Sequence, residues 1–413
     1  MGIFDYRYLG ADKIRGFDNY KYSCIDNSPI AVYISHPFWN WFVNFYPEWL
    51  APNVITLAGA SLVMGCYFFV AWLDPDMNAN NFGQPDSTTL PNWVWLVASI
   101  CTFMAHLLDG TDGKQARRTG ASGPTGELFD HGLDSWSTVP FTLTIFSIFG
   151  RGLFSISPVH LLGILITVQL VFIVTHWEKY NTGILFLSWG YDASQYGLSI
   201  FYLFTYFVGH KYYQFEVANG LTFAQAFEIS FYVAVVVSFA MSLYNMYYAY
   251  YVDGTGKQSN LYEVCLPMIS PTILFAVSVY WAQASPNHLI DTNPRLFLWT
   301  MGVVFSNIAC RLIISQMSVT RAETINKLLI LYVAVAGLAV SGVLGTSELL
   351  ALQILALILT VAHVHYGICI VRQLCSHFKI SAFSLEYLAR RKRQEISIPD
   401  ADGQDELLIP PSP

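Results

Sequence analysis

Four aspartates lie close together in a chain of 413 residues that is otherwise rich in apolar side chains. Asp109 and Asp112 close an apolar run that begins at Asn92, whereas Asp130 and Asp134 open a second run. Residues three or four apart lie on one face of a helix, so each pair is expected to share a face. The polar link between the pairs contains Gly and Pro residues that turn the chain back, which brings both pairs together.

Four ionised carboxylates in one pocket repel each other and need a compensating charge, since an aspartate in a membrane helix costs about 2.5 to 3.5 kcal/mol. Hard cations such as Mg²⁺ or Mn²⁺ bind carboxylate oxygens, and two of them form the clamp used in phosphoryl transfer. We therefore predict a two-metal site held by Asp109, Asp112, Asp130 and Asp134. Zinc is not favoured, because His and Cys do not occur here at zinc-ligand spacing. The alternative is a set of solvated acids that cap helix ends.

The spacing of this stretch resembles the complete signature of the CDP-alcohol phosphotransferase family. The matching residues are Asp109, Asp112, Gly113, Ala116, Arg117, Gly126, Asp130 and Asp134. The segments HPFWN, LAPNVIT, HWEKYNTGILFLSWGYD and AHVHYG extend the likeness across most of the chain, and they are similar to the eukaryotic choline/ethanolamine phosphotransferase branch. No cysteine follows Cys375, so the selenocysteine-bearing tail of the selenoprotein members has no counterpart in this sequence.

The resemblance implies a binding role for five further residues. Asn53 would contact the cytidine nucleotide and Arg117 a phosphate, where a guanidinium can bind two oxygens at once. Gly113, Ala116 and Gly126 would leave room for the nucleotide beside the backbone. The simpler alternatives are a helix cap at Asn53, helix-breaking glycines, and an arginine that only sets topology. For the neighbouring Arg118 we expect that topological role.

His131 is the predicted general base. It lies between two aspartates of the signature, and a neutral imidazole can accept a proton near physiological pH. In the family that the chain resembles, the equivalent histidine takes the proton of the acceptor alcohol. Asp134 is the rival base, and the plainer interpretation is a hydrogen-bonded packing histidine.

The composition is that of a polytopic membrane protein, with 54% hydrophobic, 16% aromatic and 12% charged residues. We predict an all-α fold of about ten transmembrane helices. The aromatic, Pro-containing segment 31–50 is expected to form an amphipathic helix at the membrane interface. The predicted spans are 53–73, 92–112, 127–150, 157–176, 192–209, 221–250, 261–283, 295–317, 327–345 and 348–372.

Three regions follow from this pattern. Residues 1–52 form a cytosolic N-terminal segment with the interfacial helix, 53–375 the transmembrane catalytic domain with the motif at 109–134, and 376–413 a cytosolic tail that is expected to be disordered. With the N-terminus in the cytosol, seventeen of the 21 Lys and Arg residues fall on the cytosolic side.

Arg311 lies within a span and needs a partner that the sequence does not identify. The seven cysteines are expected to be reduced.

The resemblance implies transfer of phosphoethanolamine from CDP-ethanolamine to diacylglycerol or an alkyl-acylglycerol, giving phosphatidylethanolamine and CMP. It also implies an endoplasmic reticulum or Golgi location, a site facing the cytosol, contact with membrane lipids, and allows a homodimer. The choice of ethanolamine over choline rests on resemblance alone, so a cholinephosphotransferase or dual enzyme is the close alternative. A divalent-cation transporter is the alternative from another class. The absence of a basic stripe with interleaved aromatics excludes nucleic acid as an expected partner.

Overall fold

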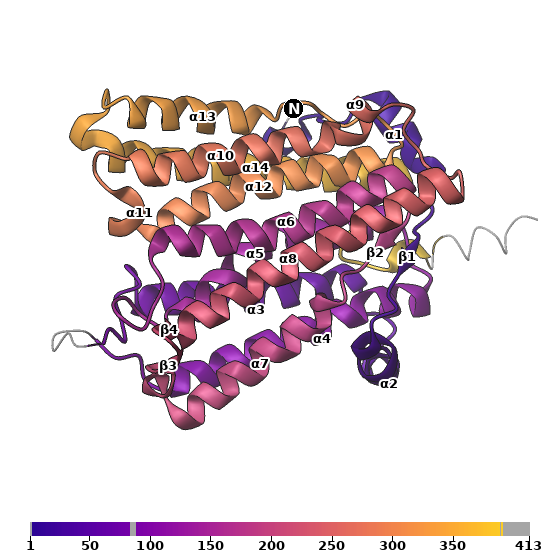
Figure 1. Ribbon diagram of the computed structural model, residues 1–413. Helices are drawn as coiled ribbons and strands as arrows, with labels where there is room; N and C mark the ends of the chain where they lie inside the picture. Colours follow the sequence, from indigo (N-terminus) through magenta and orange to yellow (C-terminus); the bar gives the residue numbers. More distant parts are fainter. Residues whose placement is uncertain (1, 83–87, 389, 391–413) are drawn as a thin grey trace, which may run out of the picture.

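Long helices that run side by side make up most of the structure, a computed structural model that describes residues 2–82, 88–388 and 390 (Figure 1). A helix lies in each of the ten ranges predicted as spans. These helices are α3 (Pro52–Leu73), α4 (Trp93–Thr119), α5 (Pro124–Phe146), α6 (Pro158–Thr182), α7 (Gly190–Val208), α8 (Phe223–Tyr247), α10 (Ile269–Ala284), α12 (Pro294–Met317), α13 (Lys327–Val340) and α14 (Glu348–Phe378).

Seven helical stretches within the described ranges are long and apolar enough to cross a membrane, which supports an integral membrane protein. The predicted count of ten is therefore approximate. Helix α13 is apolar but has only 14 residues. The first turns of α5 carry Glu127, Asp130 and Asp134, and α7 also begins with polar residues. Helices α5, α7 and α13 therefore lie in ranges predicted as spans, but they are not both as long and as apolar as the other seven.

Helix α12 lies at the centre of the bundle and packs against α5, α6, α10 and α14. In its most apolar stretch 89% of the residues are buried within the chain, against 11% for the peripheral α8. Close packing stabilises helix pairs in a membrane, because lipid tails are as apolar as the side chains. Gly302 of α12 lies against Val139 of α5, and a Cβ at this position would overlap the valine side chain. The glycine thus lets α12 support the helix that carries Asp130.

The N-terminal region lies across one end of the bundle. Figure 1 shows α2 end-on while the long helices run across the picture, which is the orientation predicted for an interfacial helix. The helical part covers residues 31–45, somewhat less than the predicted 31–50. Strand β1 pairs in parallel with β2 from the α6–α7 connection, so the N-terminal segment is attached to the bundle. The elements are η1 (Ile3–Asp5), α1 (Ala11–Asp18), β1 (Cys24–Ile25), η2 (Ala31–Ser35), α2 (His36–Phe42), η3 (Val43–Phe45) and β2 (Leu185–Phe186).

The opposite end is closed by short elements and one buried ion pair. Arg295 lies 3.7 Å from the Asp74 carboxylate, donates to the Asp74 carbonyl and to Ser147, and is almost fully buried.

Most of the predicted disordered tail, residues 391–413, lies outside the described residues, while α14 continues to residue 378. The remaining elements are η4 (His210–Tyr213), β3 (Glu216–Ala218), β4 (Leu221–Thr222), η5 (Tyr248–Val252), α9 (Leu261–Cys265), η6 (Leu266–Met268), α11 (Leu289–Thr292) and η7 (Gly345–Ser347).

Candidate active site

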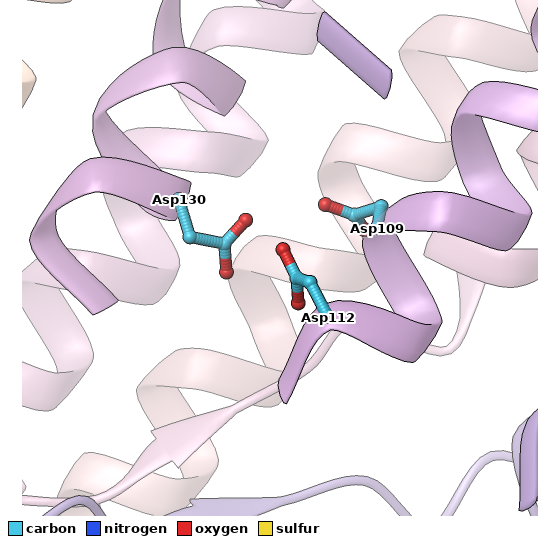
Figure 2. Close-up of side chains that lie close together, drawn as sticks. All are labelled: Asp109, Asp112 and Asp130. Carbon is cyan, nitrogen blue, oxygen red and sulfur yellow. The ribbon is translucent and has the colours of Figure 1, made fainter. Parts of the chain in front are cut away.

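Three of the four predicted metal ligands converge between α4 and α5 (Figure 2). Asp109 and Asp112 project from α4, one turn apart, and Asp130 faces them from α5; one carboxylate oxygen of each lies within 4.8 Å of those of the other two. Helix α4 ends at Gly120, whose φ of 74° places it in the left-handed region that favours glycine. The chain then reverses and starts α5, so the signature folds back on itself as its spacing predicted.

The oxygens of this cluster are suited to a hard cation. The Tyr191 hydroxyl donates to Asp109 Oδ2 at 2.8 Å, and the Thr56 hydroxyl donates to Asp112 Oδ2. Asp130 Oδ1 is buried and has no hydrogen-bond partner among the described residues. Carboxylate oxygens that face one another without an intervening donor repel, and a divalent cation removes that repulsion. Asp109, Asp112 and Asp130 could therefore hold a metal ion.

Asp134 lies one turn further along α5 and is not part of this group of three. It is half-buried, and it is close enough for the charges of Asp109 and Asp112 to act on it. On a helix, a residue four positions after Asp130 lies on the same face. The placement keeps Asp134 available to the same site, either as a fourth ligand or as the rival base.

The residues predicted to bind the nucleotide surround the same helix ends. Asn53, at the start of α3, is buried, and its Oδ1 would lie 3.5 Å from a Cβ placed on Gly126 of α5. Gly113 and the half-buried Ala116 follow the α4 aspartates along the helix. Arg117 is exposed, and its Nη1 would lie 3.7 Å from a Cβ placed on Gly113. The small side chains of Gly113, Ala116 and Gly126 leave space beside the aspartate cluster. Arg117 lies on the same side.

Arg117 and Arg118 differ in what they bind. Arg117 makes no hydrogen bond or ion pair within the part of the chain that the structure describes, although its charge acts on Asp112. Arg118 Nη1 instead donates to the carbonyl oxygens of Tyr46 at 2.7 Å and Val43 at 3.2 Å. The expected topology-setting role of Arg118 is therefore incomplete, because this arginine also ties the end of the interfacial segment to α4. Arg117 is the one that remains free for a phosphate.

His131 lies on α5 beside Asp130 with 12% of its side chain exposed, and two acids lie near its ring nitrogens. Nε2 lies 3.9 Å from Asp130 Oδ2, and Nδ1 lies 3.8 Å from Glu127 Oε1. Both distances are too long for a direct hydrogen bond. His131 Nδ1 and Glu127 Oε2 are buried without a partner among the described residues. The His176 ring packs edge-on at 5.2 Å.

A buried polar group beside His131 was not predicted. Lys179 Nζ lies 2.5 Å from Glu127 Oε1, and the Tyr20 hydroxyl donates to the same oxygen at 2.8 Å. Burial and the Glu127 carboxylate raise the pKa of Tyr20, so its hydroxyl stays protonated and can donate. Glu178, the neighbour of Lys179 in the sequence, accepts a hydrogen bond from Asn245 instead. The two charged residues of this group, Glu127 and Lys179, lie in the sequence segments GELFD and HWEKYNTG.

The interfacial helix touches the metal-site helix directly. Gly110, between the two α4 aspartates, lies against the ring of Trp39 on α2, and a Cβ at this glycine would overlap the ring. Lys114 of α4 donates to Asn40 Oδ1 at 2.8 Å. Contacts from α2 thus support the part of α4 that carries Asp109 and Asp112, in addition to the contacts that α4 makes within the bundle.

Several polar residues flagged from sequence have other partners. Arg311 donates to both oxygens of Glu323, at 2.7 and 3.0 Å, and its guanidinium lies 4.6 Å from the centre of the Tyr366 ring. Two further histidines of α14 have separate partners: His363 is close to Ser306 and Asn307, whereas His365 contacts Tyr8. All seven cysteines are free in the structure.

Comparison with known proteins identifies the family. Residues 49–237 match the CDP-alcohol phosphatidyltransferase family. Ethanolaminephosphotransferase 1 of Homo sapiens is 44% identical over 381 residues, covering 92% of this chain and 95% of that protein, and the Mus musculus protein is 44% identical over 382 residues. Cholinephosphotransferase 1 of Danio rerio is 26% identical, covering 91% of this chain and 95% of that protein. Since the likeness spans nearly the whole chain and includes the signature that forms the aspartate cluster, the chain belongs to the CDP-alcohol phosphatidyltransferase family.

Proposed function

We propose that this enzyme transfers the phosphoethanolamine group of CDP-ethanolamine to the free hydroxyl of diacylglycerol or an alkyl-acylglycerol. The products are phosphatidylethanolamine and CMP, so the reaction is the last step of the CDP-ethanolamine pathway. The observation that carries the proposal is the convergence of Asp109, Asp112 and Asp130 at two facing helix ends, beside Arg117, which has no partner among the described residues. The relatives named ethanolaminephosphotransferase 1 support ethanolamine as the alcohol.

The aspartates would hold two divalent cations, Mg²⁺ or Mn²⁺. Asp109, Asp112 and Asp130 supply oxygens that already face one another, and Asp134 supplies the fourth carboxylate. When bound, such cations offset the charge of the diphosphate and of the CMP leaving group. Asp109→Ala, Asp112→Ala and Asp134→Ala should each abolish turnover while the protein still inserts into the membrane, because each change removes a ligand and misplaces the cations.

The nucleotide would lie against the small residues of α4 and α5. Asn53 would contact the cytidine, and Gly113, Ala116 and Gly126 would let the nucleotide approach the backbone. Arg117 would orient the diphosphate, since its guanidinium can donate to two phosphate oxygens at once. Its lack of a protein partner is consistent with that role.

His131 would accept the proton of the lipid hydroxyl as that oxygen bonds to the β-phosphorus. The bond from this phosphorus to the oxygen of the CMP phosphate breaks in the same step, so no covalent enzyme intermediate is needed. His131 Nδ1 lies 3.8 Å from Glu127 Oε1, and neither Nδ1 nor Glu127 Oε2 has a partner among the described residues, so a small approach would let Nδ1–H donate to the Glu127 carboxylate. That contact would hold the ring in place and leave Nε2 on the side of Asp130. Lys179 and Tyr20 would fix Glu127 for this purpose.

The position of the site suits substrates of opposite solubility. The nucleotide would enter from the cytosol of the endoplasmic reticulum or Golgi, and the lipid acceptor would enter sideways between helices. The strong excess of Lys and Arg on the segments at this end of the bundle supports the cytosolic orientation. Both substrates could then meet at the end of α4.

One reconstitution experiment tests the proposal against its alternatives. The purified chain in detergent receives diacylglycerol with either CDP-ethanolamine or CDP-choline, with and without a chelator, and Asp109→Ala serves as the inactive control. We expect phosphatidylethanolamine as the main product and no product with chelator. Mainly phosphatidylcholine would establish the choline enzyme instead. Absence of both lipids, together with cation flux in liposomes, would favour the transporter.

A further inference from the structure

A cavity of about 570 Å³ lies between the N-terminal segment and the loop that joins α12 to α13. Its volume is within the range of small-ligand sites. Arg7, Arg311, Arg321 and Lys327 line it, together with a single acid, Glu323. None of the residues assigned to the aspartate site contributes to its wall. The cavity is therefore a separate place on the molecule with its own chemistry.

The positive charge of this cavity is only partly neutralised. Glu323 is shared between Arg311, at 2.7 Å, and Lys13, at 3.4 Å, and Arg321 pairs with Glu263 outside the cavity wall. Arg7 and Lys327 make no hydrogen bond or ion pair with any described residue. Two cations thus face the cavity without a counter-charge from the protein.

Arg311 is held in a fixed orientation toward the cavity. Its Nε donates to Asn307 Oδ1 at 3.1 Å, its Nη1 donates to Glu323, and its guanidinium stacks on Tyr366. Its Nη2 donates to no group in the described part of the chain and is not among the buried unpartnered atoms. A fixed guanidinium with one free donor is suited to a phosphate oxygen, since little side-chain entropy is lost on binding.

Lys327 adds charge where the backbone is already positive. It is the first residue of α13, and no acid occurs in the first turn of that helix. Asn326 caps the helix by accepting from the amides of Leu328 and Leu329. A cation at this end opposes the helix dipole, and a bound anion would compensate for both.

We propose that this cavity binds the phosphate group of an anionic ligand, at a site distinct from that of the nucleotide substrate. Ile325, which is 52% exposed, lies in the cavity wall, and Ile330 on α13 is 57% exposed. An apolar border beside a cationic pocket suits a phospholipid, with its phosphate in the cavity and an acyl chain along α13. Anionic lipids are enriched in the cytosolic leaflet, which is the side assigned to this end of the chain.

Binding to the full-length protein in a neutral detergent tests the site without using turnover. One arm titrates dioleoylphosphatidic acid and counts bound lipid by native mass spectrometry, and the other titrates glycerol 3-phosphate by calorimetry. In Arg7→Ala/Lys327→Ala we expect binding at least about tenfold weaker than in the unmodified chain, because two charge-assisted contacts are lost. The matched control is Arg15→Ala/Lys21→Ala, which removes equal charge from exposed positions outside the cavity and should bind within about twofold of the unmodified chain.

The two arms also identify the source of the phosphate. Binding of the lipid alone assigns a phospholipid headgroup, and binding of both ligands assigns a site for phosphate compounds in general. If neither ligand binds, or if the cavity variant and the control lose equal affinity, the proposal is wrong. Thermal unfolding without ligand checks that the variants remain folded, and Lys327→Gln, which removes the charge but keeps a polar side chain only one atom shorter, replaces the double variant if that one is unstable.

Discussion

Replacing Asp130 by asparagine should stabilise the metal-free protein while it abolishes turnover. The oxygens of Asp109, Asp112 and Asp130 lie within 4.8 Å of one another. At an effective dielectric constant of 20, two unit charges at that separation repel by about 3.5 kcal/mol. Asp130→Asn removes two such pairs, and its Oδ1 has no hydrogen bond to lose. Because solvent and counterions screen part of this repulsion, we expect a net gain of roughly 1 to 3 kcal/mol.

The assay compares thermal unfolding in detergent with chelator and with Mg²⁺. A cation that binds only the folded chain stabilises it by about 2.7 kcal/mol at a hundred times its dissociation constant. The unmodified protein should therefore gain stability when Mg²⁺ is added, and Asp130→Asn should gain much less. With chelator, the variant should unfold at the higher temperature of the two.

The same chemical change elsewhere gives the opposite sign and serves as the control. Asp74 is buried beside Arg295, at 3.7 Å, so Asp74→Asn leaves a buried cation unbalanced. Breaking such a pair typically costs about 3 to 5 kcal/mol. If Asp130→Asn and Asp74→Asn destabilise the metal-free protein equally, the aspartates do not repel one another and the metal-site interpretation fails.

Four further single substitutions and one double variant separate nucleotide binding, proton transfer and support of the base. Asn53→Ala and Arg117→Ala should raise the KM for the CDP-alcohol more than that for diacylglycerol; equal increases in a steady-state assay would indicate an effect on the fold. His131→Ala should lower kcat by about 10² to 10⁴ with nucleotide binding retained, and an unchanged rate would transfer the role of base to Asp134. Lys179→Met should destabilise the protein by about 3 to 5 kcal/mol, because it leaves Glu127 buried and unpaired. The double variant Lys179→Met/Glu127→Gln should recover most of that stability, and a thermal shift equal to that of the single variant would show that the charge is not the cause.

The sequence predicted the helices and the aspartate cluster because both depend on local pattern. Apolar runs near 20 residues fix helices of membrane length, and acids three or four apart must share a face. The turn at Gly120 and Pro124 then brings α4 and α5 together. Asp109, Asp112 and Asp130 could therefore be placed without knowing any contact between distant segments.

Local sequence pattern could not predict which residues of distant segments contact one another. Glu127 and Lys179 are 52 residues apart, and only the packing of α5 against α6 makes them partners. The partner of Arg311, Glu323, lies beyond the end of α12, where the returning loop places it over the same face. Glu178, the acid next to Lys179 in the sequence, accepts from Asn245 instead. A buried charge pair is set by tertiary structure, which one sequence does not specify.

The contact between Trp39 and Gly110 makes the aspartate pair of α4 mechanically dependent on the bilayer surface. The Trp39 ring of α2 lies directly against the backbone of α4 at Gly110, so a displacement of α2 is expected to move the segment that carries Asp109 and Asp112. At the predicted interfacial position of α2, the lateral pressure of the lipid headgroups would act on this helix. Phosphatidylethanolamine has a small headgroup and increases the curvature stress of a membrane in which it accumulates. We therefore expect turnover to vary with curvature stress, so that the physical state of the membrane acts on the enzyme that supplies its lipid.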